Sequence, residues 1–296
     1  MTSPIIFLCG GLVDIKSTSS SSVRSALMAY LAKIDCQHTK SLTLAEHFKD
    51  WVNDSIYHDL VLFEDDIASI SSLIIIILES AGALTELGLF TKNELLKNKL
   101  LIFVNDEHYH ANSFVKLGPL RHLEKARENS VCAYPWDEKD LDNSLKNILS
   151  EMHQDITSTI TKLDKEQNFD ISNKGHIAFV AYEVIKVFRA LTFTEIESFL
   201  EKIGILLSQD ELKKLLFLLD KFELVKAIKR GNLYYYYAST ETEKINFGGH
   251  FDKVAARMSA MQFYVLTPAE SRRLNAINSV FSPIIKTTTP SPSSTL

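Results

Sequence analysis

The sequence is poor in the residues that disulfide-bonded or metal-bound scaffolds need, with 3 Cys, 10 Gly and 7 Pro among 296 residues. The cysteines, Cys9, Cys36 and Cys132, are odd in number and far apart, which excludes a disulfide scaffold and a CxxC zinc site. They fit a reducing cytosol. The low glycine and proline content excludes a fibrous or low-complexity protein. With 46% hydrophobic and 23% charged residues, we expect a globular chain that buries one or two full cores.

Long hydrophobic runs are absent as well. The most apolar stretch, residues 73–78, stops at Glu79, whereas a membrane helix needs about 20 apolar residues. The apolar run near the start, residues 5–9, is too short for a signal peptide and follows no basic segment. These absences predict a cytoplasmic protein without a membrane partner.

Neither sign of charge is in large excess, because the net charge is −5 and the pI about 6.0. This balance excludes a basic field over the whole chain for binding nucleic acid. The charge is unevenly divided, however. Residues 171–296 hold 16 basic and 12 acidic residues, whereas residues 1–170 hold 16 basic and 25 acidic ones. The asymmetry predicts two halves with different partners.

The first half alternates short apolar runs with helical patterns. We expect strands at residues 5–9, 73–78, 100–104 and 131–134, and helices at 23–31, 60–70, 84–97 and 119–128. This alternation predicts an α/β domain with a doubly wound parallel sheet over residues 1–136.

The second half lacks such alternation. Residues 137–170 contain no Pro or Gly and indicate a polar helical connector. Residues 171–281 show helices and then a tight hairpin around Gly231-Asn232, the order of a winged helix-turn-helix, so we expect a mostly helical, winged-helix-like domain. Residues 282–296 are rich in Ser, Thr and Pro, which predicts a disordered tail.

Two carboxylates are the strongest chemical feature, because ligands of a parallel sheet bind outside the carboxyl ends of its strands. Glu79 follows the clearest strand, and Glu86 lies in the opening turns of the next helix. Such a pair suits cleavage of an N-glycosidic bond, in which one carboxylate attacks or stabilises the sugar C1′ and another group handles the proton. The alternative is that Glu86 is an ordinary acid near a helix N-terminus and Glu79 a solvated loop acid.

Other polar residues carry weaker signals. Gly10 and Gly11 end the first strand and permit a phosphate to approach the backbone, although a tight turn explains them equally well. His108 and His110 have the spacing of metal ligands but are expected to be polar loop residues, and we expect no metal. The acidic run 64–66 is expected to be a solvated helix face.

The segment ESAGALTELG, residues 79–88, resembles the ES-x-G-[SA]-x-x-ELG segment of retron-associated effector proteins with a nucleoside 2-deoxyribosyltransferase-like N-terminal domain. Other segments agree in order and spacing: IFLCGG at 6–11, AEHF at 45–48, LIFV at 101–104 and SFVKLGPLR at 113–121. The resemblance covers roughly residues 4–135. In these effectors a winged-helix-like DNA-binding domain follows.

The resemblance implies a toxic effector of a bacterial anti-phage system, held inactive by a reverse transcriptase and its multicopy single-stranded DNA. It implies hydrolysis of the nicotinamide–ribose bond of NAD, with NAD as substrate and no cofactor, and a homo-oligomer. The family's catalytic carboxylate falls on Glu86. Substrate-binding residues are expected at Gly10, Gly11, Glu46, Glu79, Ser80 and Gly82. Two alternatives stay open: a nucleoside or nucleotide deoxyribosyltransferase or hydrolase, and a non-enzymatic, nucleotide-sensing DNA-binding regulator.

Basic residues in the second half are candidates for contact with DNA or the reverse transcriptase. They are Lys213 and Lys214 in an expected helix and Lys226, Lys229 and Arg230 around the hairpin, next to four tyrosines at 234–237. Basic residues interleaved with aromatics suit phosphate contact and base stacking. Alternatively, alternate tyrosines face a core and the domain docks only with protein.

Overall fold

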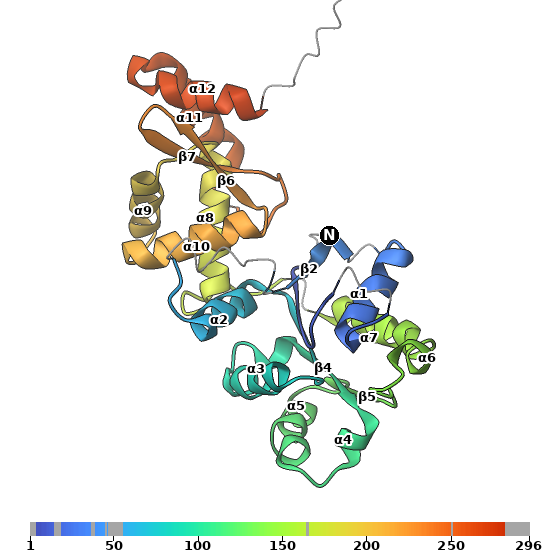
Figure 1. Ribbon diagram of the computed structural model, residues 1–296. Helices are drawn as coiled ribbons and strands as arrows, with labels where there is room; N and C mark the ends of the chain where they lie inside the picture. Colours follow the sequence, from blue (N-terminus) through green and yellow to red (C-terminus); the bar gives the residue numbers. More distant parts are fainter. Residues whose placement is uncertain are drawn as a thin grey trace, which may run out of the picture. The chain divides into compact units, whose positions relative to one another are not determined.

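The computed structural model describes residues 4–14, 19–36, 39–44, 46, 56–163, 166–249 and 251–281 (Figure 1). The chain divides into two compact units. The first comprises Met1–Phe179 with Lys213–Leu218, and the second comprises Val180–Leu212 with Leu219–Leu296. The expected tail at 282–296 lies outside the described residues, as do Ala45, His47 and Phe48 of the AEHF segment.

The first unit is built on a five-stranded parallel sheet in the order β2-β1-β3-β4-β5. Its strands are β1 Ile6–Cys9, β2 Leu42–Thr43, β3 Leu73–Ile77, β4 Leu100–Asn105 and β5 Val131–Tyr134. Every residue of β1, β3 and β4 is buried, as expected for central strands covered on both faces. The chain passes from β1 to β2 on one side of it, and then returns to form β3 on the other side of β1. The carboxyl ends of these two strands therefore form the crevice where such sheets bind ligands.

Each of the first four helices described in this unit follows a residue whose side chain caps it, whereas the fifth has no side-chain cap. Their bounds are α1 Val23–Lys33, α2 Leu60–Ile70, α3 Ala81–Lys92, α4 Asp106–His110 and α5 Arg121–Ala126. Helix α3 begins at Ala81 instead of the expected residue 84, because the Ser80 hydroxyl accepts a hydrogen bond from the Ala83 N–H at 3.1 Å. It ends at Lys92, earlier than the expected residue 97. In place of the expected helix 119–128, the structure has a π-helical turn, Lys116–Leu120, followed directly by the shorter helix α5.

The expected polar connector contributes to the core of the first unit. It forms α6 Leu141–Ser144 and α7 Ile148–Lys162. Ile148, Met152 and Ile156 repeat at helical spacing and pack into one cluster with β1, β3 and β4. Helices α1 and α7 lie side by side against this face of the sheet (Figure 1). The interpretation of this segment as a mere connector was therefore wrong.

The second unit has the element order that the sequence predicts. Its elements are α8 Lys174–Phe188, α9 Phe193–Lys202, α10 Gln209–Lys221, β6 Val225–Arg230, β7 Leu233–Ala238, α11 Lys253–Leu266 and α12 Ser271–Phe281. The start of α8 and the middle of α10 are assigned to the first unit. Gly231 occupies the hairpin turn at φ +62°, a conformation that favours glycine. The winged-helix assignment beyond this order of helices and hairpin remains a prediction.

Gly175→Ala is expected to destabilise the protein by about 1–3 kcal/mol or more. A Cβ at Gly175, in the first turn of α8, would lie 2.3 Å from the Ser69 carbonyl oxygen, which is backbone and cannot rotate away. Gly88→Ala is the matched control, since a Cβ there meets nothing within 4 Å. Because alanine favours a helix, Gly88→Ala should add about 0.5–1 kcal/mol. Urea unfolding measures both, and a Gly175→Ala protein as stable as its parent would contradict the close approach.

Candidate functional site

Glu79 lies just beyond β3 and binds the start of α1. Its carboxylate accepts hydrogen bonds from the N–H groups of Gly11 at 2.8 Å, Val23 at 2.6 Å and Arg24 at 3.0 Å. Two of these donors belong to the first turn of α1, where the helix dipole favours negative charge. Glu79 therefore fixes the loop after β1 to the N-terminus of α1.

The two glycines after β1 are needed for this packing. A Cβ on Gly11 would lie 2.7 Å from the Ser22 Cβ and 3.0 Å from the Glu79 carboxyl carbon. A Cβ on Gly10 would lie 3.0 Å from Glu79 Oε1 and 3.1 Å from the Arg24 Cβ. The close approach that the sequence assigns to a substrate is thus made, at least in part, by Glu79 and α1. A substrate role for the two glycines stays a prediction.

Arg24 is a buried cation that sequence reasoning missed. It is 3% exposed and donates to the carbonyl oxygens of Gly11 at 2.6 Å and Leu8 at 3.4 Å. Its two terminal nitrogens also bind the Glu46 carboxylate, at 2.5 and 3.3 Å. A buried guanidinium needs such an anionic partner. Glu46, an expected substrate-binding residue, therefore lies against Arg24, with 43% of its side chain exposed.

Glu86 lies in the second turn of α3, facing the end of β1. Its Oε2 atom is buried and has no hydrogen-bond partner among the described residues. Burial raises the pKa of the Glu86 carboxyl, whereas the nearby Cys9 thiol and Arg24 lower it in part. A buried polar atom left without a partner is rare in native proteins and requires an explanation, of which a catalytic role is one.

Glu64 of α2 joins the same cluster, so the interpretation of residues 64–66 as a solvated face was wrong. Burial, and then the Glu86 and Glu46 carboxylates, raise the pKa of Glu64 to about 7. Asp66 is 8% exposed and accepts a hydrogen bond from the Tyr57 hydroxyl at 2.9 Å. Helical spacing in the sequence could have indicated that Glu64 faces inward, because it lies one turn before the apolar residue Ala68. The structure shows Ala68 fully buried.

The remaining predicted site residues lie around this cluster. Ser80 caps α3 and its hydroxyl donates to the Gly10 carbonyl at 3.3 Å. Gly82 lies exposed in the first turn of α3. His110 is paired only loosely with Asp106, at 3.6 Å. Within the described ranges no group of three His, Cys, Asp or Glu side chains is arranged to hold a metal ion.

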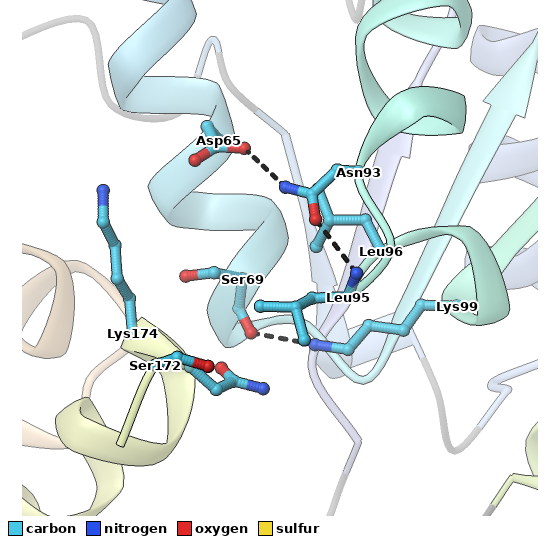
Figure 2. Close-up of a pocket in the computed structure, with 9 residues that line it drawn as sticks. Asp65, Ser69, Asn93, Leu95, Leu96, Lys99, Ser172 and Lys174 are labelled. Atoms are coloured by element: carbon cyan, nitrogen blue, oxygen red, sulfur yellow. Dashed lines mark hydrogen bonds between the residues drawn. The ribbon is translucent and has the colours of Figure 1, made fainter. Parts of the chain in front are cut away.

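A separate cavity of about 200 Å³ lies near the amino ends of β3 and β4 (Figure 2). Lys99 lines this cavity and donates a hydrogen bond to the Ser69 carbonyl at 2.9 Å. The Asn93 amide, also in the lining, donates to the Asp65 carboxylate at 3.2 Å. Burial lowers the pKa of Lys99 to about 8. None of the carboxylates near Glu86 lines this cavity, so it lies apart from the cluster at the carboxyl ends.

The hairpin places its basic residues on two faces. Side chains of paired residues share a face, and the face alternates along a strand. Lys226 pairs with Tyr237 and Arg230 with Leu233 on one face, and Lys229 pairs with Tyr234 on the other.

The two faces differ in what covers them. On the first, Arg230 donates to the Ser279 hydroxyl of α12 at 2.6 Å, and Tyr235 is 3% exposed. The alternative interpretation, that alternate tyrosines face a core, therefore holds for Tyr235. Lys226 is paired with Asp220 at 3.1 Å, and the Lys229 ammonium lies 5.5 Å from the centre of the Tyr234 ring.

Comparison with known proteins gives the family. The profile described as "STM3845 retron effector protein" matches residues 20–227, more than half of the chain. This chain belongs to that family of retron effectors. The resemblance to retron effectors drawn from the 79–88 segment is thus confirmed, and the matched region contains Arg24, Glu46, Glu64 and Glu86.

Two curated relatives from Escherichia coli are similar to this effector. The "Retron Ec86 putative ribosyltransferase/DNA-binding protein" is 31% identical over 176 residues, covering 57% of this chain and 54% of the relative. The "Retron Ec73 putative ribosyltransferase/DNA-binding protein" is 27% identical over 215 residues, covering 67% and 66%. The matches thus span about half to two thirds of the relatives' length. No described helix of this effector is both long and apolar enough to cross a bilayer.

Glu64→Gln is expected to stabilise this retron effector at pH 8 and to leave its stability nearly unchanged at pH 4.5. Because the folded-state pKa of Glu64 is raised from 4.5 to about 7, the folded state binds the extra proton in this window and stability falls as pH rises through it. Glutamine removes that loss, which we put at about 1–2 kcal/mol after allowing for partial exposure. Urea unfolding at both pH values measures it, with the exposed Glu138→Gln as control. An equal effect of Glu64→Gln at both pH values would contradict the raised pKa.

Proposed function

We propose that this retron effector is an N-glycosidase whose α/β unit hydrolyses the nicotinamide–ribose bond of NAD. The observation that carries the proposal is the buried Oε2 of Glu86, which lacks a partner among the described residues at the carboxyl ends of β1 and β3. A carboxylate oxygen that no protein group binds can attack the sugar C1′ or stabilise positive charge there once the substrate reaches it. The names of the relatives, which include ribosyltransferase, support glycosyl chemistry.

Glu64 supplies the second group that such chemistry needs. With a pKa of about 7, its carboxyl exchanges a proton near neutral pH. Nicotinamide leaves NAD as a neutral base, so its departure requires no acid. Ionised Glu64 then takes a proton from the water that attacks C1′, and the sugar is released. Two carboxylates in different environments thereby take different roles.

The same geometry gives the second candidate, a nucleoside or nucleotide deoxyribosyltransferase or hydrolase, a different pH dependence. The base of a nucleoside leaves only after it gains a proton, which makes protonated Glu64 the active form. NAD hydrolysis should therefore rise as pH increases through about 7, and nucleoside cleavage should fall. A non-enzymatic regulator would show neither NAD hydrolysis nor nucleoside cleavage at any pH.

The experiment is a substrate panel with purified protein across this pH range. Release of nicotinamide from NAD and release of bases from nucleosides and nucleotides are measured side by side by chromatography. Cellular NAD is measured on expression in parallel. Base release without loss of NAD supports the transferase or hydrolase, and unchanged substrates together with unchanged cellular NAD support the regulator. Either result contradicts the NAD proposal.

The proposed setting is a three-part anti-phage system in which the reverse transcriptase and its multicopy single-stranded DNA hold this toxin inactive. Family membership supports association with retron components, and the relatives' names include DNA-binding. The basic excess of residues 171–296 supports contact through the second half. We expect the effector to form at least a dimer, which light scattering of the purified protein tests.

A further inference from the structure

The cavity near the amino ends of β3 and β4 is lined by separate segments of the first unit. Asp65 and Ser69 come from α2. Lys99 directly precedes β4, and Asn173 directly precedes α8. The Ser69 carbonyl oxygen accepts the hydrogen bond from Lys99, and a Cβ on Gly175 would lie 2.3 Å from the same oxygen. Lys99 and the first turn of α8 therefore both lie next to Ser69.

Lys99 brings a positive charge to this cavity that no acid balances. Its ammonium group donates to a neutral carbonyl (Figure 2) and forms no ion pair within the part of the chain that the structure describes. Burial lowers its pKa to about 8, and no carboxylate opposes that change. A lysine withdrawn from water is normally paired with an anion. Two of the three N–H donors of Lys99 are left for a ligand.

Asn173 is a second source of donors in the lining. It is 6% exposed, and its side-chain oxygen accepts from the N–H groups of Gly175 at 2.9 Å and His176 at 3.4 Å. These bonds fix the orientation of the amide and leave its nitrogen without an acceptor among the described residues. A buried donor of this kind requires a partner. The positive end of the 15-residue helix α8 lies beside it.

The other charged groups near Lys99 do not balance its charge. Lys174 is bound to Asp66, with 2.6 Å between its nitrogen and the carboxylate oxygen. Asp65, an acid in the lining, already accepts a hydrogen bond from a neighbouring amide. Burial, and then the Lys99 charge, lower the pKa of His176 at the start of α8. The cavity therefore has an excess of donors and of positive charge around Lys99, which suits an anion.

We propose that this cavity binds a phosphate group, either inorganic phosphate or that of a mononucleotide, through the Lys99 ammonium group and the Asn173 amide nitrogen. A phosphate group presents strong acceptor oxygens in several directions, so it can accept from both side chains at once, and helix N-termini favour it. A cavity of about 200 Å³ is smaller than those that hold drug-sized ligands, which suits a single phosphate group. None of the carboxylates near Glu86 lines it. The site is therefore independent of the proposed glycosidase function.

The test is calorimetric titration of the full chain with inorganic phosphate, adenosine monophosphate and acetate. Lys99→Met removes the charge at similar side-chain length. Asn173→Asp keeps the side-chain oxygen that caps α8 but replaces the donating amide with an acid. Asp65→Asn removes an acid that repels the ligand and keeps an acceptor for the Asn93 amide. Lys125→Met, at an exposed position of α5, is the matched control.

We expect phosphate to bind the parent and Lys125→Met equally and to bind Asp65→Asn more tightly. Lys99→Met and Asn173→Asp should each bind it about tenfold more weakly or less, the effect of losing a hydrogen bond to a charged group. Phosphate should also move the Lys99 titration to higher pH, because a bound anion favours the charged ammonium. Carbon-13 NMR of the lysine Cε atoms follows this titration, with Lys99→Met to assign the signal. Adenosine monophosphate that displaces phosphate identifies a mononucleotide, and failure to displace it identifies the free ion.

Several results would overturn the inference. One is the absence of binding by either phosphate compound up to about 10 mM, a concentration at which even a weak specific site is occupied. Another is binding that Lys99→Met leaves unchanged, since the ligand would then occupy a different site. Acetate that binds as tightly as phosphate would refute the assignment of a phosphate group. Because none of these measurements needs turnover, their outcome does not depend on whether the effector hydrolyses NAD.

Discussion

Glu86→Gln is expected to abolish nicotinamide release and toxicity while leaving the protein folded. Replacing a carboxylate that attacks or stabilises C1′ removes several kcal/mol of transition-state stabilisation, which corresponds to a rate loss of about 10³-fold or more. The charge itself does not stabilise the fold, because burial raises the pKa of Glu86 and ionisation in the folded state is therefore costly. Near pH 7.5 the melting temperature should stay the same or rise.

Glu79→Gln is the control that separates catalysis from folding. Its carboxylate accepts from three backbone N–H groups, and a glutamine side chain would turn its amide nitrogen toward one or more of these donors. This variant should therefore melt at a lower temperature, in contrast to Glu86→Gln. A Glu86→Gln protein that accumulates to normal levels and is still toxic would contradict the catalytic assignment.

The second large effect concerns partner binding. We expect simultaneous replacement of Lys213, Lys214, Lys226, Lys229 and Arg230 by Gln to weaken binding to the complex of retron DNA and reverse transcriptase. If all five side chains neutralise phosphates, the log–log salt dependence of the affinity should flatten by up to about 4, at roughly 0.7–0.9 for each phosphate that is no longer neutralised. Electrophoretic mobility shifts at several salt concentrations measure this slope. Hydrolysis of NAD by the free effector should not change.

A charge-matched control replaces five exposed lysines among residues 1–170 by Gln. These are Lys92, Lys125, Lys139, Lys146 and Lys162. If both variants lose affinity equally, the attraction is non-specific. If the first variant assembles normally at every salt concentration, its basic residues only face solvent. Loss of hydrolysis by the free variant would instead mean that the second half shapes the active site.

The hairpin register subdivides this prediction. Because Lys229 lies on the opposite face from Lys226 and Arg230, one flat surface cannot contact all three. Lys226 and Arg230 are already bound to Asp220 and Ser279. Of single hairpin substitutions we therefore expect Lys229→Gln to reduce the salt slope most.

The strands were predictable because central parallel strands are apolar on both faces. Residues 73–78 and 100–104 were found within one residue for this reason. The expected helix 23–31 also begins where α1 does, and the Ser22 side chain caps it by accepting a hydrogen bond from the Ser25 N–H at 2.9 Å. Helix α7 was misread because its apolar residues are spaced among polar ones over a long segment.

The site was only partly predictable, since a carboxylate's role depends on partners brought in by the fold. Glu79 and Glu86 occur in the same short segment, yet one binds three backbone N–H groups and the other has a buried oxygen without a partner among the described residues. Arg24 and Glu64 were missed because their partners lie on other elements. Whether a polar residue on a helix is buried or solvated is decided by what packs against it, which a sequence pattern does not state.

The hydrogen bonds of Glu79 also bear on the order in which the chain assembles during synthesis. The backbone N–H groups of Gly11 and Val23 can form these hydrogen bonds only after Glu79, which lies 68 and 56 residues later in the chain, has been synthesised. Strand β1 is likewise flanked by strands made after it, with Ile6 paired to Leu42 and Leu73. The loop after β1, although it is synthesised before its partners, is thus among the last parts to reach its native form, because these non-local interactions must form before α1 is anchored. The candidate catalytic cluster therefore stays incomplete until β3 and the start of α3 have been synthesised, so the topology of this effector delays the assembly of the site during synthesis.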